Sequence, residues 1–183
     1  REVHISRVNA AFTYPADFIL IAAMNPCPCG YLGDPQRECT CTDGEIRRYG
    51  QKISGPLLDR IDLHVSVMRP KYSELTATIQ GEPSCDIAKR VAEARAVQAE
   101  RLSRWHMQSN AQMGHRQLKE TCQLDAEGTE MLRVVFEKLH LSARSYDRII
   151  KVARTIADLA GSDQIRPEHV AEAISFRNMI NGK

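Results

Sequence analysis

Four of the six cysteines of this chain lie close together in the sequence, and thiolates are strong ligands for zinc. They form two C-x-C pairs separated by nine residues: Cys27, Cys29, Cys39 and Cys41. Four thiolates on two short turns can close a tetrahedral structural metal site, and Gly30 and Gly33 supply the tight backbone that such turns need. The usual spacing within a pair is C-x-x-C, so structural thiols without metal and a redox pair remain open as alternatives.

Three polar residues at the ends of expected elements are candidates for a ligand-binding site. Asn25 is the first polar residue after the apolar run Phe18–Met24. Arg60 ends an expected short helix, and Arg144 lies in the first turn of the most clearly amphipathic helix. In open α/β sheets ligands bind at the carboxyl ends of strands, where an asparagine can orient a water molecule or a phosphate oxygen. A cation in the first turn of a helix is unfavourable by about 0.3–1 kcal/mol, which a bound phosphate would offset.

Each of these residues also has an ordinary structural role as its alternative. The asparagine can satisfy the hydrogen bonds of its own turn. Arg60 can pair with the aspartates on either side of it, Asp59 and Asp62. Arg144 can be balanced by the aspartate three residues later, Asp147.

The positive charge of the chain is unevenly distributed. The formal net charge is only +2, so the composition gives no general argument for binding nucleic acid. Between Lys89 and Lys119, however, there are seven lysines or arginines and two glutamates. This stretch is either a solvated helix face or a surface that faces phosphates. Arg7, on an expected hairpin, is a further candidate for contact with DNA.

The sequence shows no signal peptide and no membrane span. Its longest apolar run, Phe18–Met24, is far shorter than the roughly 20 residues that a transmembrane helix needs. A cytoplasmic protein without membrane contact is expected. Thiols stay reduced in the cytoplasm, which favours a metal over disulfides for the clustered cysteines.

The first 70 residues are expected to form an α/β part. Alternating apolar residues predict a β-hairpin with its tip near Asn9. The run Phe18–Met24 predicts a buried parallel strand, since strands covered on both faces lose the alternation. A cysteine-rich insertion, at about residues 26–44, precedes a helix over 44–53 and a short helix in SGPLLDR. The alternation in Ile61–Met68 predicts a half-buried strand.

Residues 71–183 are expected to be helical. The stretch Met68–Pro83 contains prolines and a glycine without a sustained period, which places the boundary there. Beyond it, apolar residues at helical spacing predict four helices: one from Ser84 to about Trp105, one around Leu132–Leu139, one over Ser142–Ala160 and one that begins at Pro167. The expected fold class is therefore α/β followed by all-α.

Three long segments resemble the carboxy-terminal half of the magnesium-chelatase-like AAA+ ATPases. They are AAMNPCPCGYLGDP, CTCTDGEIRRYGQKISGPLLDRIDLHV and LSARSYDRIIKVARTIADLAGSDQIRPEHVAEAI, and the resemblance covers nearly the whole chain. The closest branch is the ComM/YifB group of bacterial competence proteins. The resemblance implies a partial AAA+ α/β core, made of the hairpin, a sensor-1 strand, the cysteine loop and an arginine-finger strand, followed by a helical lid domain.

The resemblance also implies roles for individual residues. Asn25 matches the sensor-1 asparagine, Arg60 the arginine finger and Arg144 the sensor-2 arginine, all of which act on ATP. The hairpin that carries Arg7 matches the pre-sensor-1 hairpin. Proteins of this branch are hexameric motors that move branched DNA during natural transformation. The implied partners are therefore branched or single-stranded DNA and further copies of the same chain.

The motif that holds the phosphates of ATP is absent from the sequence. G-x-x-x-x-G-K-[ST] does not occur, and the only Gly-Lys pair is Gly182-Lys183. No apolar run ends in the paired acids that usually hold magnesium. The chain is therefore expected to serve an ATP- and magnesium-dependent enzyme as part of a longer protein and to be inactive by itself.

Two other functions remain open. A metal-chelatase motor of tetrapyrrole synthesis shares the fold, and only the cysteine loop speaks against it, by resemblance. A stand-alone zinc-containing module that binds nucleic acid would have no ATPase activity. A nucleotide-binding half upstream in the natural gene would exclude this last alternative.

Overall fold

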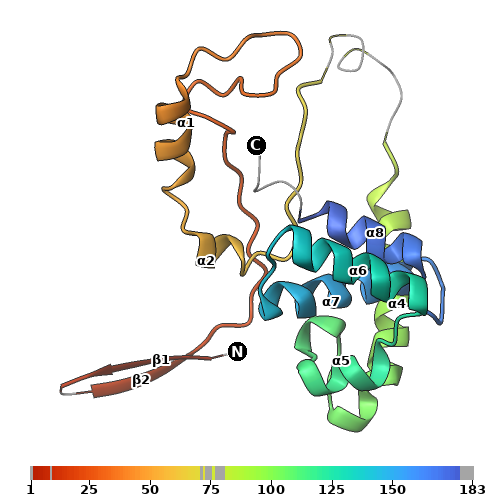
Figure 1. Cartoon of the computed structure of the whole chain (residues 1–183). Helices are drawn as coiled ribbons and strands as arrows, with labels where there is room; N and C mark the ends of the chain where they lie inside the picture. Colours follow the sequence, from red (N-terminus) through yellow and green to blue (C-terminus); the bar gives the residue numbers. More distant parts are fainter. Residues whose placement is uncertain (1, 9, 71, 73–75, 77–80, 178–183) are drawn as a thin grey trace. The chain divides into compact units, whose positions relative to one another are not determined.

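The computed structural model describes residues 2–8, 10–70, 72, 76 and 81–177. By their contacts the residues divide into two compact units, Arg1–Lys52 and Ile53–Lys183, and each unit is considered by itself. Most of the regular structure is helical, and the named strands form a single two-stranded sheet (Figure 1). The expected division into domains near residue 70 stays a prediction, because compact units and domains need not share a boundary.

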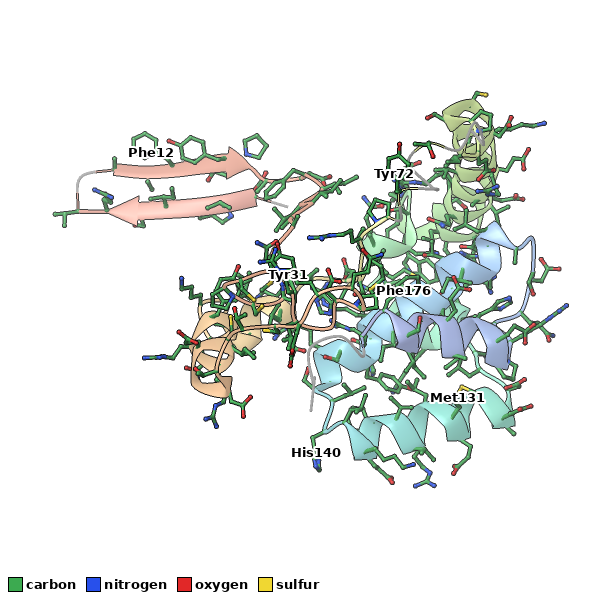
Figure 2. The ribbon with its side chains drawn as sticks, turned by 90° about the horizontal axis from the view of Figure 1, so that it is seen from above. Phe12, Tyr31, Tyr72, Met131, His140 and Phe176 are labelled. Atoms are coloured by element: carbon green, nitrogen blue, oxygen red, sulfur yellow. The ribbon has the colours of Figure 1, made fainter. Side chains whose placement is uncertain are left out.

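The first unit begins with the expected β-hairpin. Strands β1 (Glu2–Arg7) and β2 (Ala10–Pro15) are antiparallel, with Glu2 opposite Pro15 and Arg7 opposite Ala10. The expected tip at Asn9 lies outside the described residues. Apolar side chains alternate along both strands, and Phe12, labelled in Figure 2, is about half exposed. The prediction of a hairpin is confirmed.

Two segments that were expected to be strands are not strands. Phe18–Met24 and Ile61–Met68 lie outside every described strand, and their large apolar side chains are mostly exposed. A strand requires a neighbour for its backbone hydrogen bonds. Apart from a single bridge between Leu124 and Ile165, the described residues form such a ladder only within the hairpin. Both strand predictions are therefore wrong, and the described elements do not include the sheet of an α/β core.

Two predicted helices follow the cysteine loop in the sequence. Helix α1 (Asp43–Gly50) begins with a capping box at Thr42 and ends three residues earlier than expected. Helix α2 (Gly55–Leu58) has Ser54 as its N-cap. The hydroxyl of Ser54 accepts a hydrogen bond from the backbone amide of Leu57. Both helices are confirmed, and α2 belongs to the second unit.

Five further α-helices are described between residues 81 and 177. They are α4 (Ser84–Leu102), α5 (His115–Thr121), α6 (Ala126–Lys138), α7 (Ala143–Leu159) and α8 (Pro167–Ser175), with the 3-10 helices η1 (Ser103–Trp105) and η2 (Asn110–Gln112) after α4. The four helices predicted for this part are confirmed, and α5 is an additional one. Within the described residues, no helix is long and apolar enough to cross a membrane.

Helix α7 supplies the centre of the core of the second unit. Its buried face consists of apolar residues at helical spacing: Ile149, Ile150, Ala153 and Ala157. This face packs against α8 and α4, while α6 packs against α8 and carries Met131, which is labelled in Figure 2. After α7 the chain turns at Gly161, whose φ of +64° is the left-handed conformation that favours glycine.

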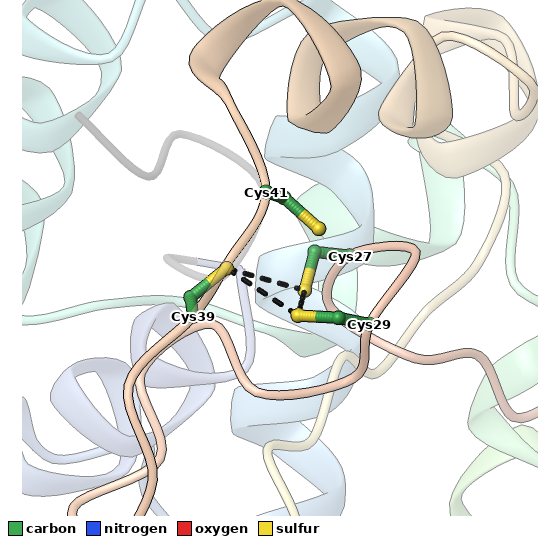
Figure 3. Close-up of side chains that lie close together, drawn as sticks. All are labelled: Cys27, Cys29, Cys39 and Cys41. Carbon is green, nitrogen blue, oxygen red and sulfur yellow. Dashed lines mark hydrogen bonds between the residues drawn. The ribbon is translucent and has the colours of Figure 1, made fainter.

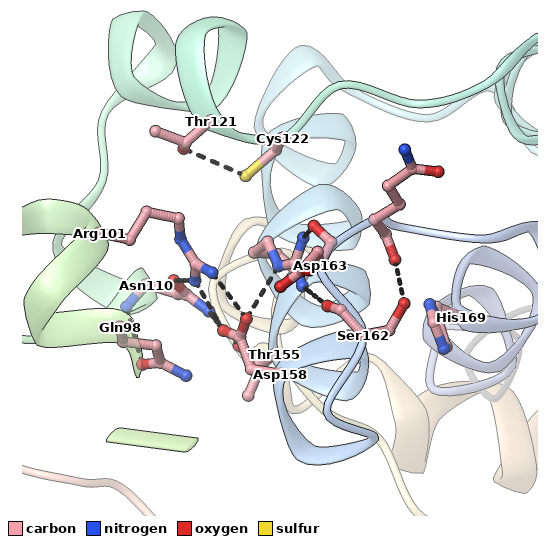
Figure 4. Close-up of polar contacts among 12 residues, drawn as sticks. Gln98, Arg101, Asn110, Thr121, Cys122, Thr155, Asp158, Ser162, Asp163 and His169 are labelled. Carbon is pink, nitrogen blue, oxygen red and sulfur yellow. Dashed lines mark hydrogen bonds and ion pairs between the residues drawn. The ribbon is translucent and has the colours of Figure 1, made fainter. Parts of the chain in front are cut away.

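A buried polar network joins α7 to α4 and η2 (Figure 4). The carboxylate of Asp158 is fully buried and accepts two hydrogen bonds from Arg101, at 2.7 and 2.8 Å. It also accepts hydrogen bonds from Arg154 at 3.0 Å and from Asn110 at 2.8 Å. Burial acts to raise the pKa of Asp158, but these hydrogen bonds and the two guanidinium charges outweigh it and lower the pKa. The network therefore holds a charged carboxylate within the core.

Candidate functional site

Asp59, directly after α2, is bound to the beginning of α7. Its two carboxylate oxygens accept hydrogen bonds from the hydroxyls of Ser142, at 2.8 Å, and Ser145, at 2.7 Å. Ser142 is the N-cap of α7, and Ser145 is buried in its first turn. The hydrogen bond from Ser145 is the main cause that lowers the pKa of Asp59; burial opposes it, and the hydrogen bond from Ser142 adds to it. Asp59 thus places a negative charge where the dipole of α7 is positive.

The chain around Asp59 is also held by arginines from the second half of the same unit. Arg148 on α7 forms an ion pair with Asp62. Arg177, after α8, donates to the backbone carbonyl of Ile61 at 2.8 Å. The amide of His64 donates to a carbonyl at the end of α8, at 2.9 Å. Part of the segment expected as a strand is therefore held by helical partners instead of by a neighbouring strand.

Arg60 is exposed and has no acidic partner among the described residues. Its guanidinium donates to the carbonyl of Pro56, one turn earlier in the chain, at 2.7 Å. The two aspartates that could have neutralised it are bound elsewhere: Asp59 to the serines of α7 and Asp62 to Arg148. The two acids that could pair with Arg60 thus have other partners among the described residues, and the role of Arg60 stays a prediction.

Arg144 is exposed in the first turn of α7, as expected from the sequence. Asp147, the expected structural partner, instead contacts His115 at 3.0 Å. The positive charge of Arg144 contributes to the lowered pKa of Asp59, so the two groups interact electrostatically. Among the residues that the structure describes, none forms a hydrogen bond with the side chain of Arg144. Arg60 and Arg144 are thus both exposed, and neither has an acidic hydrogen-bond partner among the described residues.

Asn25 is exposed and belongs to the first unit, whereas Arg60 and Arg144 share the second. The loop after Asn25 folds back toward its side chain. A Cβ atom on Gly30 would lie 3.8 Å from the side-chain nitrogen Nδ2 of Asn25. Gly30 has a φ of +83°, and its amide donates to the carbonyl of Cys27 at 3.1 Å. The joint role expected for the asparagine and the two arginines stays a prediction.

The four loop cysteines come together in the first unit (Figure 3). All four sulfur atoms lie within 4.8 Å of one another. A backbone hydrogen bond from Tyr31 lowers the pKa of Cys29 to about 5, against the opposing effect of burial. For Cys41, a backbone hydrogen bond acts to lower the pKa, but burial and the neighbouring thiols outweigh it and raise the pKa to about 12. The neighbouring thiols are therefore close enough to shift one another's protonation.

The basic stretch Lys89–Lys119 carries less free charge than its sequence suggests. Four of its seven basic residues form ion pairs with acids outside the stretch: Arg90 with Glu82, Arg101 with Asp158, and Arg104 and Arg116 with Glu120. The excess of positive charge is largely neutralised in the folded unit, which favours the solvated helix face over a phosphate-facing surface. Arg7, at the end of β1, is exposed on the hairpin.

The sequence did not indicate the roles of Asp59, Ser145 or Arg177. Ser142 was readable as a helix start, but no local pattern links it to an aspartate that lies 83 residues earlier. Asp59 appeared only as a partner for Arg60. Its actual partners become visible only when α2 and α7 lie together in the fold.

Two family models match the chain in succession. Magnesium chelatase, subunit ChlI, matches residues 1–75, and the C-terminal model of the same subunit matches residues 81–177. Competence protein ComM of Haemophilus influenzae is 40% identical over 181 residues, which is 98% of this chain and 34% of that protein. The uncharacterized proteins YifB of Escherichia coli and Rv2897c of Mycobacterium tuberculosis are 40% and 38% identical, each over 96% of this chain and 34% of the relative. The chain thus spans about a third of the length of these curated relatives.

Proposed function

Because the chain belongs to the magnesium chelatase ChlI family, we propose that it is the nucleotide-sensing, carboxy-terminal part of an AAA+ ATPase that remodels DNA. The relative named as a competence protein supports DNA as the substrate, since competence is the uptake of DNA. We further propose that the full-length protein works as a hexamer on branched or single-stranded DNA.

The observation that carries the proposal is the exposure of two arginines of the second unit, one next to Asp59 in the sequence and one in the first turn of α7. Arg60 and Arg144 are exposed, and neither has an acidic hydrogen-bond partner among the described residues. The neighbouring acids are bound to Ser142, Ser145 and Arg148. Each of these exposed guanidinium groups can bind the oxygens of a phosphate through paired hydrogen bonds.

The proposed mechanism follows from the chemistry of phosphoryl transfer, which depends on positioning and charge stabilisation. In it, Asn25 orients the attacking water, Arg144 binds a phosphate in its own subunit, and Arg60 reaches the nucleotide of the neighbouring subunit. The two guanidinium groups carry only donors and cannot bind a cation such as magnesium, which prefers carboxylates and water. We therefore expect the carboxylate ligands for magnesium in the part of the full-length protein that carries the phosphate-binding loop.

We expect the full-length protein to hydrolyse ATP. The 183-residue chain alone should neither hydrolyse ATP nor bind it tightly. The reason is that the backbone amides and the lysine of a phosphate-binding loop are missing from this sequence. Titration with ATP by calorimetry, together with an assay of phosphate release, checks both statements. Micromolar affinity of the chain alone, or no ATPase activity in the full-length protein with DNA present, contradicts the proposal.

Arg7→Ala should weaken the binding of DNA by the full-length protein and reduce the dependence of that binding on salt. Each lost phosphate contact lowers the slope of log affinity against log salt concentration by about one. Fluorescence anisotropy with a labelled branched DNA at several salt concentrations measures this slope. Arg166→Ala is a control, because that arginine is also exposed, belongs to the second unit and lies 3.7 Å from Glu168. An equal slope for Arg7→Ala and the parent excludes a contact between this residue and DNA.

The names of the matching family models favour a second candidate, a motor subunit of a metal chelatase. Such a motor acts on a partner protein that inserts a metal into a tetrapyrrole. The two candidates differ in the substrate that accelerates ATP hydrolysis. Stimulation by branched DNA supports the DNA motor, whereas indifference to every form of DNA together with measurable ATPase activity supports the chelatase.

A further inference from the structure

The cysteine cluster of the first unit has no part in the proposed ATPase chemistry. The distances between its sulfur atoms are 3.4 Å from Cys27 to Cys29, 3.7 Å from Cys27 to Cys39 and 3.6 Å from Cys29 to Cys39. The sulfur of Cys41 lies within 4.8 Å of the other three. The four sulfur atoms therefore surround a common centre.

These distances match the size of a zinc–thiolate site. A zinc–sulfur bond is about 2.3 Å long, so two sulfurs of one tetrahedral site lie about 3.8 Å apart. A pair of disulfides would instead bring two sulfur pairs to about 2.05 Å. Here one sulfur, that of Cys27, has two other sulfurs at nearly equal distances, and all six cysteines of the chain are free.

The first unit also lacks the hydrophobic core that would explain why four thiols gather without a metal. Among the described residues from 2 to 52, Cys27 is the single buried one. Small units that cannot bury enough apolar surface are usually stabilised by disulfides or by a metal. Two glycines with positive φ, Gly30 at +83° and Gly33 at +79°, shape the loop between the two cysteine pairs. The loop is thus held by something other than apolar packing.

We propose that Cys27, Cys29, Cys39 and Cys41 bind one zinc ion that holds the loop together. Four protein ligands leave no open position for a substrate, so the site is structural and not catalytic. Soft thiolates exclude magnesium and calcium, which prefer oxygen ligands. The proposal is independent of the ATPase function, because it concerns only the metal content and the order of the loop.

The test is a metal count on the full-length protein, expressed without added zinc and purified under reducing conditions. We expect about one zinc per chain by elemental mass spectrometry. Cys27→Ser and Cys39→Ser should each lose most of it, whereas Cys85→Ser should retain it. Cys85 is the matched control, because it is an exposed free cysteine outside the cluster.

A second measurement identifies the ligands directly. Cobalt(II) exchanged into the parent protein should give the intense visible and near-ultraviolet bands of a tetrahedral tetrathiolate site, and Cys39→Ser should weaken or shift them. Far-ultraviolet circular dichroism shows whether the variants remain folded. Purified protein without metal, whose cysteines all react with a thiol reagent or are paired in disulfides, overturns the proposal. A full complement of iron in place of zinc also overturns it.

Discussion

Arg60→Ala should lower the rate of ATP hydrolysis by the full-length protein by about 10³-fold or more while leaving the binding of ATP and the folding unchanged. An arginine supplied across a subunit boundary stabilises the charge that spreads over the transferring phosphoryl group, and in other nucleotide hydrolases it contributes 10³–10⁵ in rate. Little stability should be lost, since the exposed side chain has only one described hydrogen bond, to the carbonyl of Pro56. Phosphate release under saturating ATP measures the rate.

Arg48→Ala is the matched control for this prediction. Arg48 is exposed and also donates to the carbonyl four residues earlier, that of Gly44, at 3.3 Å. Its replacement removes the same kind of local hydrogen bond and should leave turnover near the parent rate. An Arg60→Ala protein that hydrolyses ATP as fast as its parent would show that this arginine is not the finger.

Mixing experiments separate action across a boundary from action within one subunit. Arg60→Ala subunits mixed with subunits that lack the phosphate-binding lysine should recover some activity, because some boundaries then combine an intact nucleotide site with an intact arginine. Arg144→Ala should show no recovery with the same partner, since both defects act on a subunit's own nucleotide. Recovery in both mixtures would place Arg144 at the boundary as well.

Asp158→Ala should lower the free energy of unfolding of the 183-residue chain by about 3–5 kcal/mol. The substitution leaves Arg154, which is buried, and Arg101, which is partly buried, without their common carboxylate. Such a loss is large because an uncompensated buried charge remains. Trp105, the one tryptophan of the sequence, lies in η1 of the same unit, so its fluorescence follows the unfolding by urea.

The pH dependence of stability gives a second readout of the same residue. The pKa of Asp158 is lowered in the folded chain, so its stabilising effect is present above the ordinary aspartate pKa of about 3.9 and is lost as the pH falls toward the lower folded value. Asp158→Ala should lack this part of the acid sensitivity. Asp147→Ala, on the same helix, removes a carboxylate paired with the exposed His115 and should cost no more than about 1 kcal/mol. Equal losses for the two variants would contradict a structural role of the buried network.

The helices could be predicted from the sequence because their signals are local. Ser142 at the start of α7 and Pro167 in the first turn of α8 fix these helices through neighbouring residues, and the buried face of α7 repeats at helical spacing. Helix α5 was missed because its seven residues include only one buried side chain, Leu118, and therefore show no period. Short helices of this kind depend on the packing around them.

The strands and the candidate site depend on partners that local sequence does not reveal. Phe18–Met24 has the composition of a buried strand, but the described residues offer it no neighbouring strand. In the same way the sequence placed Arg60 between two aspartates, and only the fold shows that both are bound to residues of α7. For the cysteines, the spacing indicated two pairs, whereas their convergence to within 4.8 Å required the loop geometry.

The bonds of Asp59 give the proposed motor a route for communication between neighbouring active sites. Asp59 is linked by one peptide bond to Arg60 and by two hydrogen bonds to the turn of α7 that carries Arg144. In the proposed assignment these arginines serve two different nucleotides, one in their own subunit and one in the next. If α7 shifts when Arg144 gains or loses a phosphate, its hydrogen bonds to the carboxylate of Asp59 move Arg60 as well. By thermodynamic reciprocity, the state of the neighbour's nucleotide changes the affinity at the subunit's own site by the same factor, so the binding of nucleotide around the proposed ring becomes cooperative.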